Sequence, residues 1–90
     1  MLDIVYTEEF AQNYQALPLS IQKKIEKQEK LFRANPFHPS LRTEKLAPKQ
    51  HELWSLRVDL RYRIIFRFLE TTTVVLLTVN THDRVYRLRG

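Results

Sequence analysis

The chain has 90 residues, of which 43% are hydrophobic, one is glycine and none is cysteine, and its formal net charge at pH 7 is +5. This length suits one domain, residues 1–90, with a single modest core, and the lack of cysteine excludes disulfides and thiolate metal sites. The longest apolar run, residues 74–77, is far shorter than the roughly 20 residues of a membrane span. The N-terminus is acidic where a signal peptide is basic, so we expect a cytoplasmic protein.

The positive charge is concentrated in the C-terminal part of the chain. Residues 57–90 contain seven arginines and no lysine against three acidic residues, whereas residues 1–56 contain eight basic against seven acidic residues. The planar guanidinium of arginine donates two hydrogen bonds to a phosphate group and stacks on nucleic-acid bases. The pattern therefore favours a polyanionic partner, with nucleic acid as the first candidate; an excess charge that only keeps the protein soluble is the alternative.

The first half of the chain predicts one strand and two helices. Residues 2–6 alternate and are β-branched, which is typical of a short strand. Thr7 can cap the following helix, whose apolar stripe is formed by Phe10, Tyr14 and Leu17. Pro18 interrupts this helix, and a second is predicted from Ser20, with Ile21, Ile25, Gln28 and Phe32 along one face. Residues 34–50 contain three prolines and are predicted to form a long loop.

From Leu53 onward the hydrophobic period becomes two, which indicates strands. We predict strands over 53–58, 61–69 and 73–79, followed by a tail that ends in a turn or one helical turn. The middle strand has one apolar face, and the other face carries Arg61, Arg63, Ile65 and Arg67. The fold class is α+β, in the order β-α-α-β-β-β: two N-terminal helices packed on one face of a small, mainly antiparallel, twisted sheet.

The sheet face away from the helices is predicted to carry clustered arginines. Arg61, Arg63 and Arg67 share it, and Arg57 joins them if the first two of these strands form a hairpin. Cations crowded in this way repel each other, so the face costs stability unless an anion or an acidic protein covers it. An ordinary solvated face is the alternative.

The histidines offer a candidate acid but no metal site. His82 directly follows the central strand, where a side chain can project from the end of the sheet, and Tyr86 comes four residues later. Three scattered histidines without cysteine form no tight ligand set, so we expect neither a metal nor a cofactor. The single glycine, Gly90, also excludes glycine-rich phosphate loops and nucleophile elbows.

Three short motifs occur in a fixed order: Trp54–Val58, Tyr62–Phe66 and His82–Arg87. Together with the β-α-α-β-β-β order they resemble the RelE/ParE superfamily of bacterial type II toxin–antitoxin toxins, over essentially the whole chain. RelE-like members are endoribonucleases that enter the ribosomal A site and cut mRNA. ParE-like members poison DNA gyrase and have no known nuclease site.

The resemblance implies site residues closest to those of the YoeB- and YafQ-like mRNA interferases. Glu44 stands at a matching distance before Trp54 and would be the general base, Arg63 would stabilise the developing charge, and His82 would be the general acid. Tyr86 would stack on the base next to the cut. Further RNA-binding candidates are Arg57, Arg61, Arg67, Lys45 and Lys49, the two lysines being only approximate counterparts of the pair in RelE.

The chain also departs from the family pattern and leaves alternatives open. YoeB-like chains end in His-Tyr, whereas this chain continues to Gly90. Glu44 could instead be a loop carboxylate that caps or is solvated, and Arg63 could pair structurally with Asp59 or Asp83.

The chemistry of RNA cleavage fits these residue types. The 2′-hydroxyl must lose a proton, the phosphorane charge must be stabilised, and the 5′-oxygen must be protonated, for which an imidazole titrating near neutral pH is suited. We expect a toxin that is a metal-independent, ribosome-dependent endoribonuclease, with the ribosome, mRNA and an acidic antitoxin that folds on binding as partners. The alternatives are a ParE-like gyrase inhibitor and an inert family member that acts only as a repressor partner.

Overall fold

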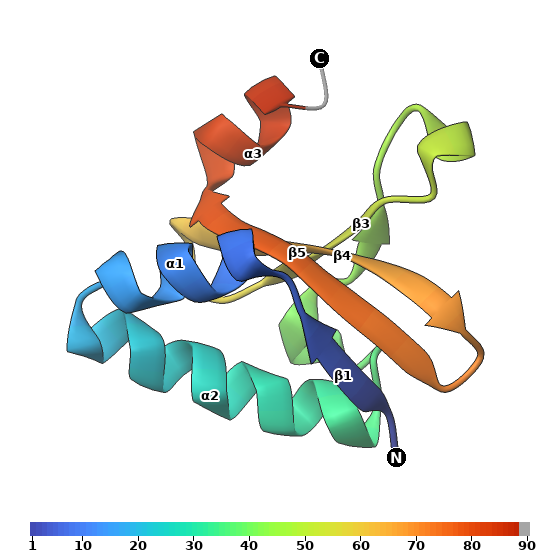
Figure 1. Cartoon of the computed structure of the whole chain (residues 1–90), viewed down its shortest axis with the longest axis horizontal. Coiled ribbons are helices and arrows are strands. Elements are labelled where there is room, and N and C mark those ends of the chain that lie inside the picture. The colour runs from blue at the N-terminus through green and yellow to red at the C-terminus, as the bar shows by residue number, and fades with distance from the viewer. Residues whose placement is uncertain (89–90) are drawn as a thin grey trace.

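The computed structural model describes residues 1–88, and the side chains of residues 1–85. In this part of the chain five strands form one sheet in the order β1-β5-β4-β3-β2, with three α-helices around it (Figure 1). The strands are β1 (Asp3–Tyr6), β2 (Glu44–Lys45), β3 (Trp54–Arg57), β4 (Tyr62–Glu70) and β5 (Thr73–Thr81). The helices are α1 (Glu8–Ala16), α2 (Leu19–Ala34) and α3 (His82–Leu88). The predicted α+β class and element order are confirmed, with β2 and α3 as additions.

The sheet is mainly antiparallel, as predicted. β1 pairs in parallel with the first half of β5, from Asp3 opposite Thr73 to Tyr6 opposite Leu76, and the other neighbouring strands are antiparallel. Beyond the end of β1, Thr7 and helix α1 supply hydrogen-bond partners for the edge of β5. The Thr7 hydroxyl donates to the carbonyl of Leu77 (2.7 Å) and Asn13 Nδ2 donates to the Thr78 hydroxyl (2.8 Å). These bonds satisfy polar groups in the second half of β5, between its pairing with β1 and the start of α3.

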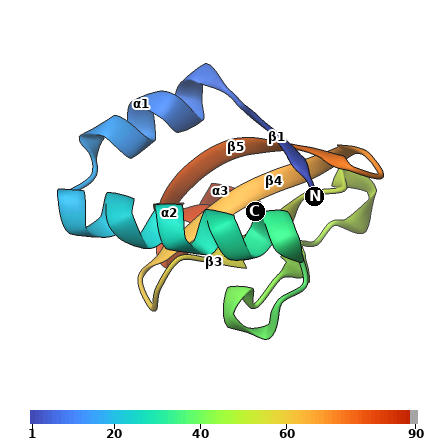
Figure 2. The same ribbon diagram turned by 90° about the horizontal axis from the view of Figure 1, so that it is seen from below.

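The two N-terminal helices form where the sequence predicts them and cover one face of the sheet (Figure 2). Thr7 caps α1, because its hydroxyl oxygen accepts from the Phe10 amide (3.0 Å). Ile25, Gln28 and Phe32 form the buried face of α2. The buried Gln28 amide is satisfied because its Nε2 donates to the carbonyl of Arg57 (2.8 Å), which ties α2 to the end of β3.

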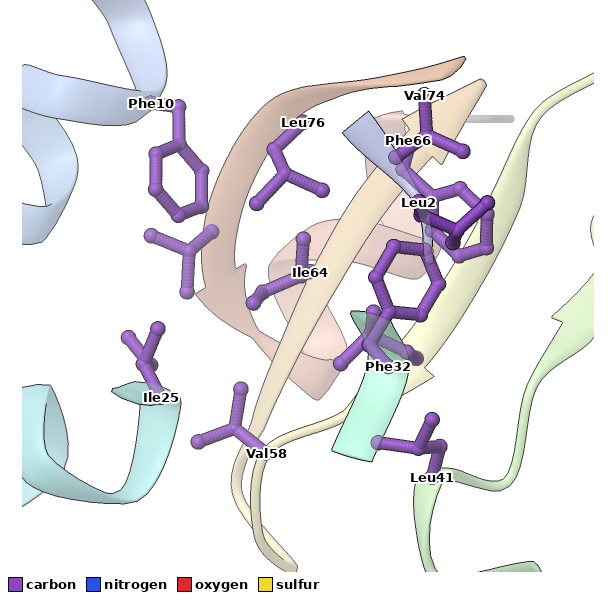
Figure 3. Packing of buried hydrophobic residues seen from close by; sticks show 12 residues of the cluster. Leu2, Phe10, Ile25, Phe32, Leu41, Val58, Ile64, Phe66, Val74 and Leu76 are labelled. Atoms are coloured by element: carbon purple, nitrogen blue, oxygen red, sulfur yellow. The ribbon is translucent and has the colours of Figure 1, made fainter. Parts of the chain in front are cut away.

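The main core lies between these helices and the sheet. Phe32 of α2 meets Phe66 of β4 edge-on, with ring centroids 4.9 Å apart, and both rings are fully buried (Figure 3). Ile64, Leu56 and Val74 surround them from three different strands. Each fully buried side chain of this kind stabilises the fold by about 1.5–3 kcal/mol, so this face of the sheet holds the helices in place.

The opposite face is partly covered, which corrects the expectation of an open arginine face. A second, smaller cluster is formed there by Leu46, Ile65 and Val85, with Leu53 and Leu77 packed against it. Ile65 and Leu77 alternate onto this face and need apolar cover, which Leu46 from the loop and Val85 from α3 provide. The arginines are therefore divided rather than continuous.

Two segments are more ordered than the sequence predicts. The tail forms a seven-residue helix, α3, rather than a turn or a single helical turn. The long loop contains β2 and the 3-10 turns Pro39–Leu41 and Lys49–His51. Both differences have the same cause, because Val85 and Leu46 are fully buried and hold their segments on the sheet.

The β3–β4 turn is built by Asp59. One oxygen of its carboxylate accepts from the amides of Arg61 and Tyr62, both at 2.8 Å, and the other accepts from Lys24 of α2 at 3.2 Å. Partial burial acts to raise the pKa of Asp59, but these hydrogen bonds outweigh it and hold the pKa below its ordinary value of 3.8. The turn is therefore tied to both the sheet and α2.

Replacing Phe66 with Ala is expected to lower the free energy of unfolding by about 3–5 kcal/mol, because a buried ring is lost and a cavity remains. The measurement is urea unfolding followed by far-UV circular dichroism. Leu69→Ala is the control on the same strand: its side chain is 55% exposed, and its removal should cost less than about 0.5 kcal/mol. Equal losses in the two variants would contradict the packing described above.

Asp59→Asn should destabilise the protein in a pH-dependent way. The folded-state pKa of Asp59 is depressed, so the stabilisation by its charge is present above the ordinary value of 3.8 and is lost as the pH falls through the folded-state pKa. The difference in unfolding free energy between wild type and variant should therefore be largest near neutral pH and shrink in acid. Urea titrations of both proteins at about pH 7 and about pH 3 measure it, and a difference independent of pH would refute the assignment.

Candidate functional site

A polar pocket of about 480 Å³ lies where the β3–β4 turn meets the junction of β5 and α3. Two short segments far apart in the sequence form it. They contribute Leu60, Arg61, Arg63, Thr81, His82 and Asp83, and we call the hollow between them the arginine pocket. The pocket therefore brings together three of the predicted site residues, Arg61, Arg63 and His82.

Arg63 is held at the pocket by the backbone of the turn. It lies near the start of β4, between Arg57 of β3 and Asn80 of β5 in the ladder. Its Nη1 donates to the carbonyl oxygens of Asp59 (2.7 Å) and Tyr62 (3.2 Å). These acceptors are neutral, so they orient the guanidinium without cancelling its charge. This contact between Arg63 and Asp59 is thus to the main-chain carbonyl of Asp59.

His82 is positioned by the end of β5 and the start of α3. Its backbone amide donates to the carbonyl of Arg61 (2.6 Å), which joins α3 to the turn. The Thr81 hydroxyl accepts from the Arg84 amide (3.4 Å) as an N-cap does, and Asp83 lies in the first helical turn, where the helix dipole favours an acid. Nδ1 of His82 is 3.6 Å from the Asp83 carboxylate, and the imidazole is 46% exposed. The imidazole is thus accessible to a ligand in the pocket.

The charges of the pocket suit a phosphodiester. Arg61 and Arg63 line it, Arg57 is the ladder partner of Arg63, and Asp83 is the acidic residue of the lining. Guanidinium groups bind phosphate oxygens with paired hydrogen bonds. An imidazole beside a bound phosphate can exchange a proton with one of its ester oxygens.

Glu44 lies on the same sheet face but outside the pocket lining. It pairs with Ser55 in β3, and Ser55 pairs with Ile65 in β4, so all three point to the face of Arg63. Two strand spacings, about 10 Å, separate Glu44 from β4. The sequence match thus identifies a carboxylate on the correct face, at a distance from Arg63 and His82.

The other predicted RNA contacts are spread over the surface. Lys45 lies over the ring of Trp54, 5.8 Å from its centroid, and Lys49 is in an exposed 3-10 turn. Arg67 is exposed on β4 and is separated from Arg63 by the covered Ile65. Tyr86 belongs to α3, and its side chain lies outside the described residues.

Sequence reasoning missed two features of this site. Leu60 and Thr81 line the pocket and were not singled out. Thr81 carries a recognisable signal, because Thr-His-Asp after a strand combines an N-cap residue with an acid in the first turn. Nothing in the sequence pattern marks Leu60, which is 82% exposed.

A smaller pocket of about 280 Å³ lies on the helix side, between α1 and α2. Its lining is mostly apolar and aromatic, including Phe10, Tyr14 and Ile25, with Tyr6 and Glu29 joined by a hydrogen bond. It has no lining residue in common with the arginine pocket.

Within residues 1–88 no group of three His, Cys, Asp or Glu side chains could hold a metal ion. No helix in that range is long and apolar enough to cross a membrane.

Known structures share this fold. The YoeB/ParE toxin from Agrobacterium tumefaciens is 19% identical, with a TM-score of 0.75 over 90% of this chain and 99% of that chain. RelE in the RelB–RelE complex from Methanococcus jannaschii is 20% identical, with a TM-score of 0.72 over 96% and 99%. YafQ from E. coli is 16% identical, with a TM-score of 0.71 over 96% and 99%.

Sequence comparison gives the family. No curated protein matches the sequence, but the family model described as the ParE toxin of the type II toxin–antitoxin system parDE matches residues 4–86. That match runs from β1 into α3. The chain therefore belongs to the ParE toxin family of type II toxin–antitoxin systems, within the RelE/ParE superfamily.

Proposed function

We propose that this toxin is a cytoplasmic, metal-independent endoribonuclease that cuts mRNA on the ribosome and so arrests translation. The observation that carries the proposal is the pocket in which Arg61, Arg63 and His82 lie together. A cation for the phosphate and an imidazole for proton transfer are the groups that such a cleavage needs.

In the proposed reaction Arg63 binds the scissile phosphate and stabilises the charge that develops on it. The 2′-hydroxyl gives its proton to a base, and its oxygen attacks the phosphorus to form a 2′,3′-cyclic phosphate. The bond from phosphorus to the 5′-oxygen breaks, and His82 supplies the proton that this oxygen takes up. The carbonyls of Asp59 and Tyr62 already orient Arg63, which reduces the reorganisation needed during the reaction.

Glu44 is the proposed base, as the carboxylate on the face that also bears Arg63. Because β2 lies two strands from β4, the RNA has to lie across β3 to reach both groups. The ribosome would hold the mRNA in that path, and Arg57, Arg67 and Lys49 would contact its backbone. Lys45, which lies over Trp54 on the helix side of β2, would contact it from the edge of the sheet. Tyr86 would stack on the base beside the cut.

A ParE-like inhibitor of DNA gyrase is the second candidate. The matching family model is itself that of ParE toxins, and the distance of Glu44 from the pocket favours a site without a base. In that case the arginines would contact protein rather than RNA. The third candidate is an inert family member that acts only with its partner as a repressor.

Arg63→Ala and His82→Gln are expected to reduce mRNA cleavage by at least about 100-fold, because one removes the charge stabiliser and the other the proton donor. Cleavage is measured by primer extension on mRNA in a translating extract. His82→Gln should lower kcat more than it raises KM, since glutamine keeps size and polarity but transfers no proton at neutral pH. Lys27→Ala, which removes one positive charge from the exposed side of α2, is the control and should cut like wild type.

The cleavage assay, together with a supercoiling assay on purified DNA gyrase, distinguishes the three candidates. Undiminished cleavage by Arg63→Ala would refute the role given to Arg63. A wild-type protein that leaves mRNA intact and blocks supercoiling by gyrase would establish the gyrase inhibitor. A wild-type protein that is inactive in both assays would establish the inert family member.

An acidic antitoxin is the proposed protein partner. Structures with related folds include the YoeB–YefM complex from Staphylococcus aureus and the DinJ–YafQ complex from E. coli. This chain has a net charge of +5, with its arginines concentrated after residue 56, so an acidic segment that folds on binding would be complementary to it.

Expression of this chain alone should arrest growth, and co-expression with the neighbouring small open reading frame should restore it. The purified pair should associate more slowly as salt is added, because charge steering is screened; stopped-flow mixing at two salt concentrations measures this. Normal growth with high yield of the wild-type chain alone would contradict a toxin role.

A further inference from the structure

Both main groups of the pocket are held by a single turn. Arg63 donates from Nη1 to the carbonyls of Asp59 and Tyr62, at 2.7 and 3.2 Å. The backbone amide of His82 donates to the carbonyl of Arg61 at 2.6 Å. All three acceptors lie within residues 59–62, so the orientation of these few peptide groups determines where Arg63 and His82 lie.

The Asp59 side chain fixes two of these peptide groups. Its Oδ1 accepts from the amides of Arg61 and Tyr62, both at 2.8 Å, as in turns built by aspartate or asparagine. The amide nitrogen of Tyr62 and the carbonyl of Arg61 belong to one peptide plane. The bond that fixes the first therefore directs the second toward His82. The same oxygen fixes the amide of Arg61, which belongs to the preceding peptide plane of the turn.

The Lys24 contact is the weaker part of this arrangement. Lys24 Nζ lies 3.2 Å from Oδ2 of Asp59, and the lysine side chain is 53% exposed whereas that of Asp59 is 21% exposed. Solvent screens such a pair, which stabilises by little. The two amide bonds of the other oxygen therefore carry the restraint, and Asp59 itself is not among the lining residues of the pocket.

We propose that Asp59 is a positioning residue of the arginine pocket: its carboxylate fixes the peptide plane whose carbonyl holds the His82 amide, and with it the turn whose flanking carbonyls hold Arg63. The inference rests on the proposed function for its effect on RNA cleavage. It also predicts a property of the protein alone, the immobilisation of the Arg63 guanidinium and of the His82 amide, which does not depend on that function.

The test compares three variants at a temperature where all are folded. Asp59→Ala removes both acceptor bonds. Asp59→Asn keeps an Oδ1 that accepts from both amides, and loses the charge and the oxygen that accepts from Lys24. Asn35→Ala is the matched control, because Asn35 Oδ1 also accepts from a backbone amide two residues ahead, that of Phe37 (3.0 Å), in a loop remote from the pocket.

Asp59→Ala should lower kcat for cleavage by at least about 10-fold with little change in KM, since misplaced groups still bind but no longer match the transition state. Asp59→Asn and Asn35→Ala should stay within about 3-fold of wild type. In NMR spectra the Arg63 guanidinium signals of Asp59→Ala should shift from their wild-type positions, because the turn that supplies two of its acceptors is no longer fixed. Its His82 amide should exchange with solvent at least about 10-fold faster than in wild type.

Each outcome decides one of the two proposals. Asp59→Ala with wild-type cleavage, or with unchanged Arg63 signals and His82 exchange, would overturn the positioning role. Equal losses in Asp59→Ala and Asn35→Ala would also overturn it, since they would reflect stability alone. A wild-type protein without nuclease activity would defeat the proposed function, and the NMR comparison would still decide the role of Asp59.

Discussion

The register between β4 and β5 is the constraint on which the rest of the structure depends. Arg63 lies opposite Asn80 and Tyr62 opposite Thr81, so His82, the next residue along, emerges beside the β3–β4 turn. The same register sends Ile64 and Phe66 into the main core. A slip of one residue would move the arginines to the helix side and the aromatic rings to solvent. The core burial that pins the register therefore also holds the pocket together.

The regular part of this arrangement could be predicted from the sequence because it follows from periodicity. Alternation in residues 61–69 assigns Phe66 and Arg63 to opposite faces, and the stripe containing Ile25 and Phe32 identifies the buried side of α2. The covered part of the second face was not predictable in the same way. Leu46 stands alone among prolines and charges, and only the position of Ile65 across the sheet explains its burial.

Individual residues of the candidate site, but not their arrangement in space, can be named from the sequence. A motif identifies Arg63 and His82, and a strand end and a turn bring them together. The distance of Glu44 from them depends on β2, which has two residues and no periodicity of its own. The role of Asp59 is equally hidden, because a turn aspartate in a sequence indicates a turn but not which carbonyl groups that turn directs at its neighbours.

A shared fold leaves the chemistry to the site, and the two chemistries of this superfamily make different demands on it. A surface that docks on a protein needs complementary charge and shape, which mobile arginines supply. A cleavage site needs its groups held to within about 0.5 Å by a supporting layer of bonds. Here carbonyl groups of one short turn accept from Arg63 at 2.7 Å and from the His82 amide at 2.6 Å, and Asp59 in turn fixes two amides of that turn at 2.8 Å. This restraint holds the Arg63 guanidinium and the main chain of His82, and it is the observation that distinguishes this surface from a set of independent arginines.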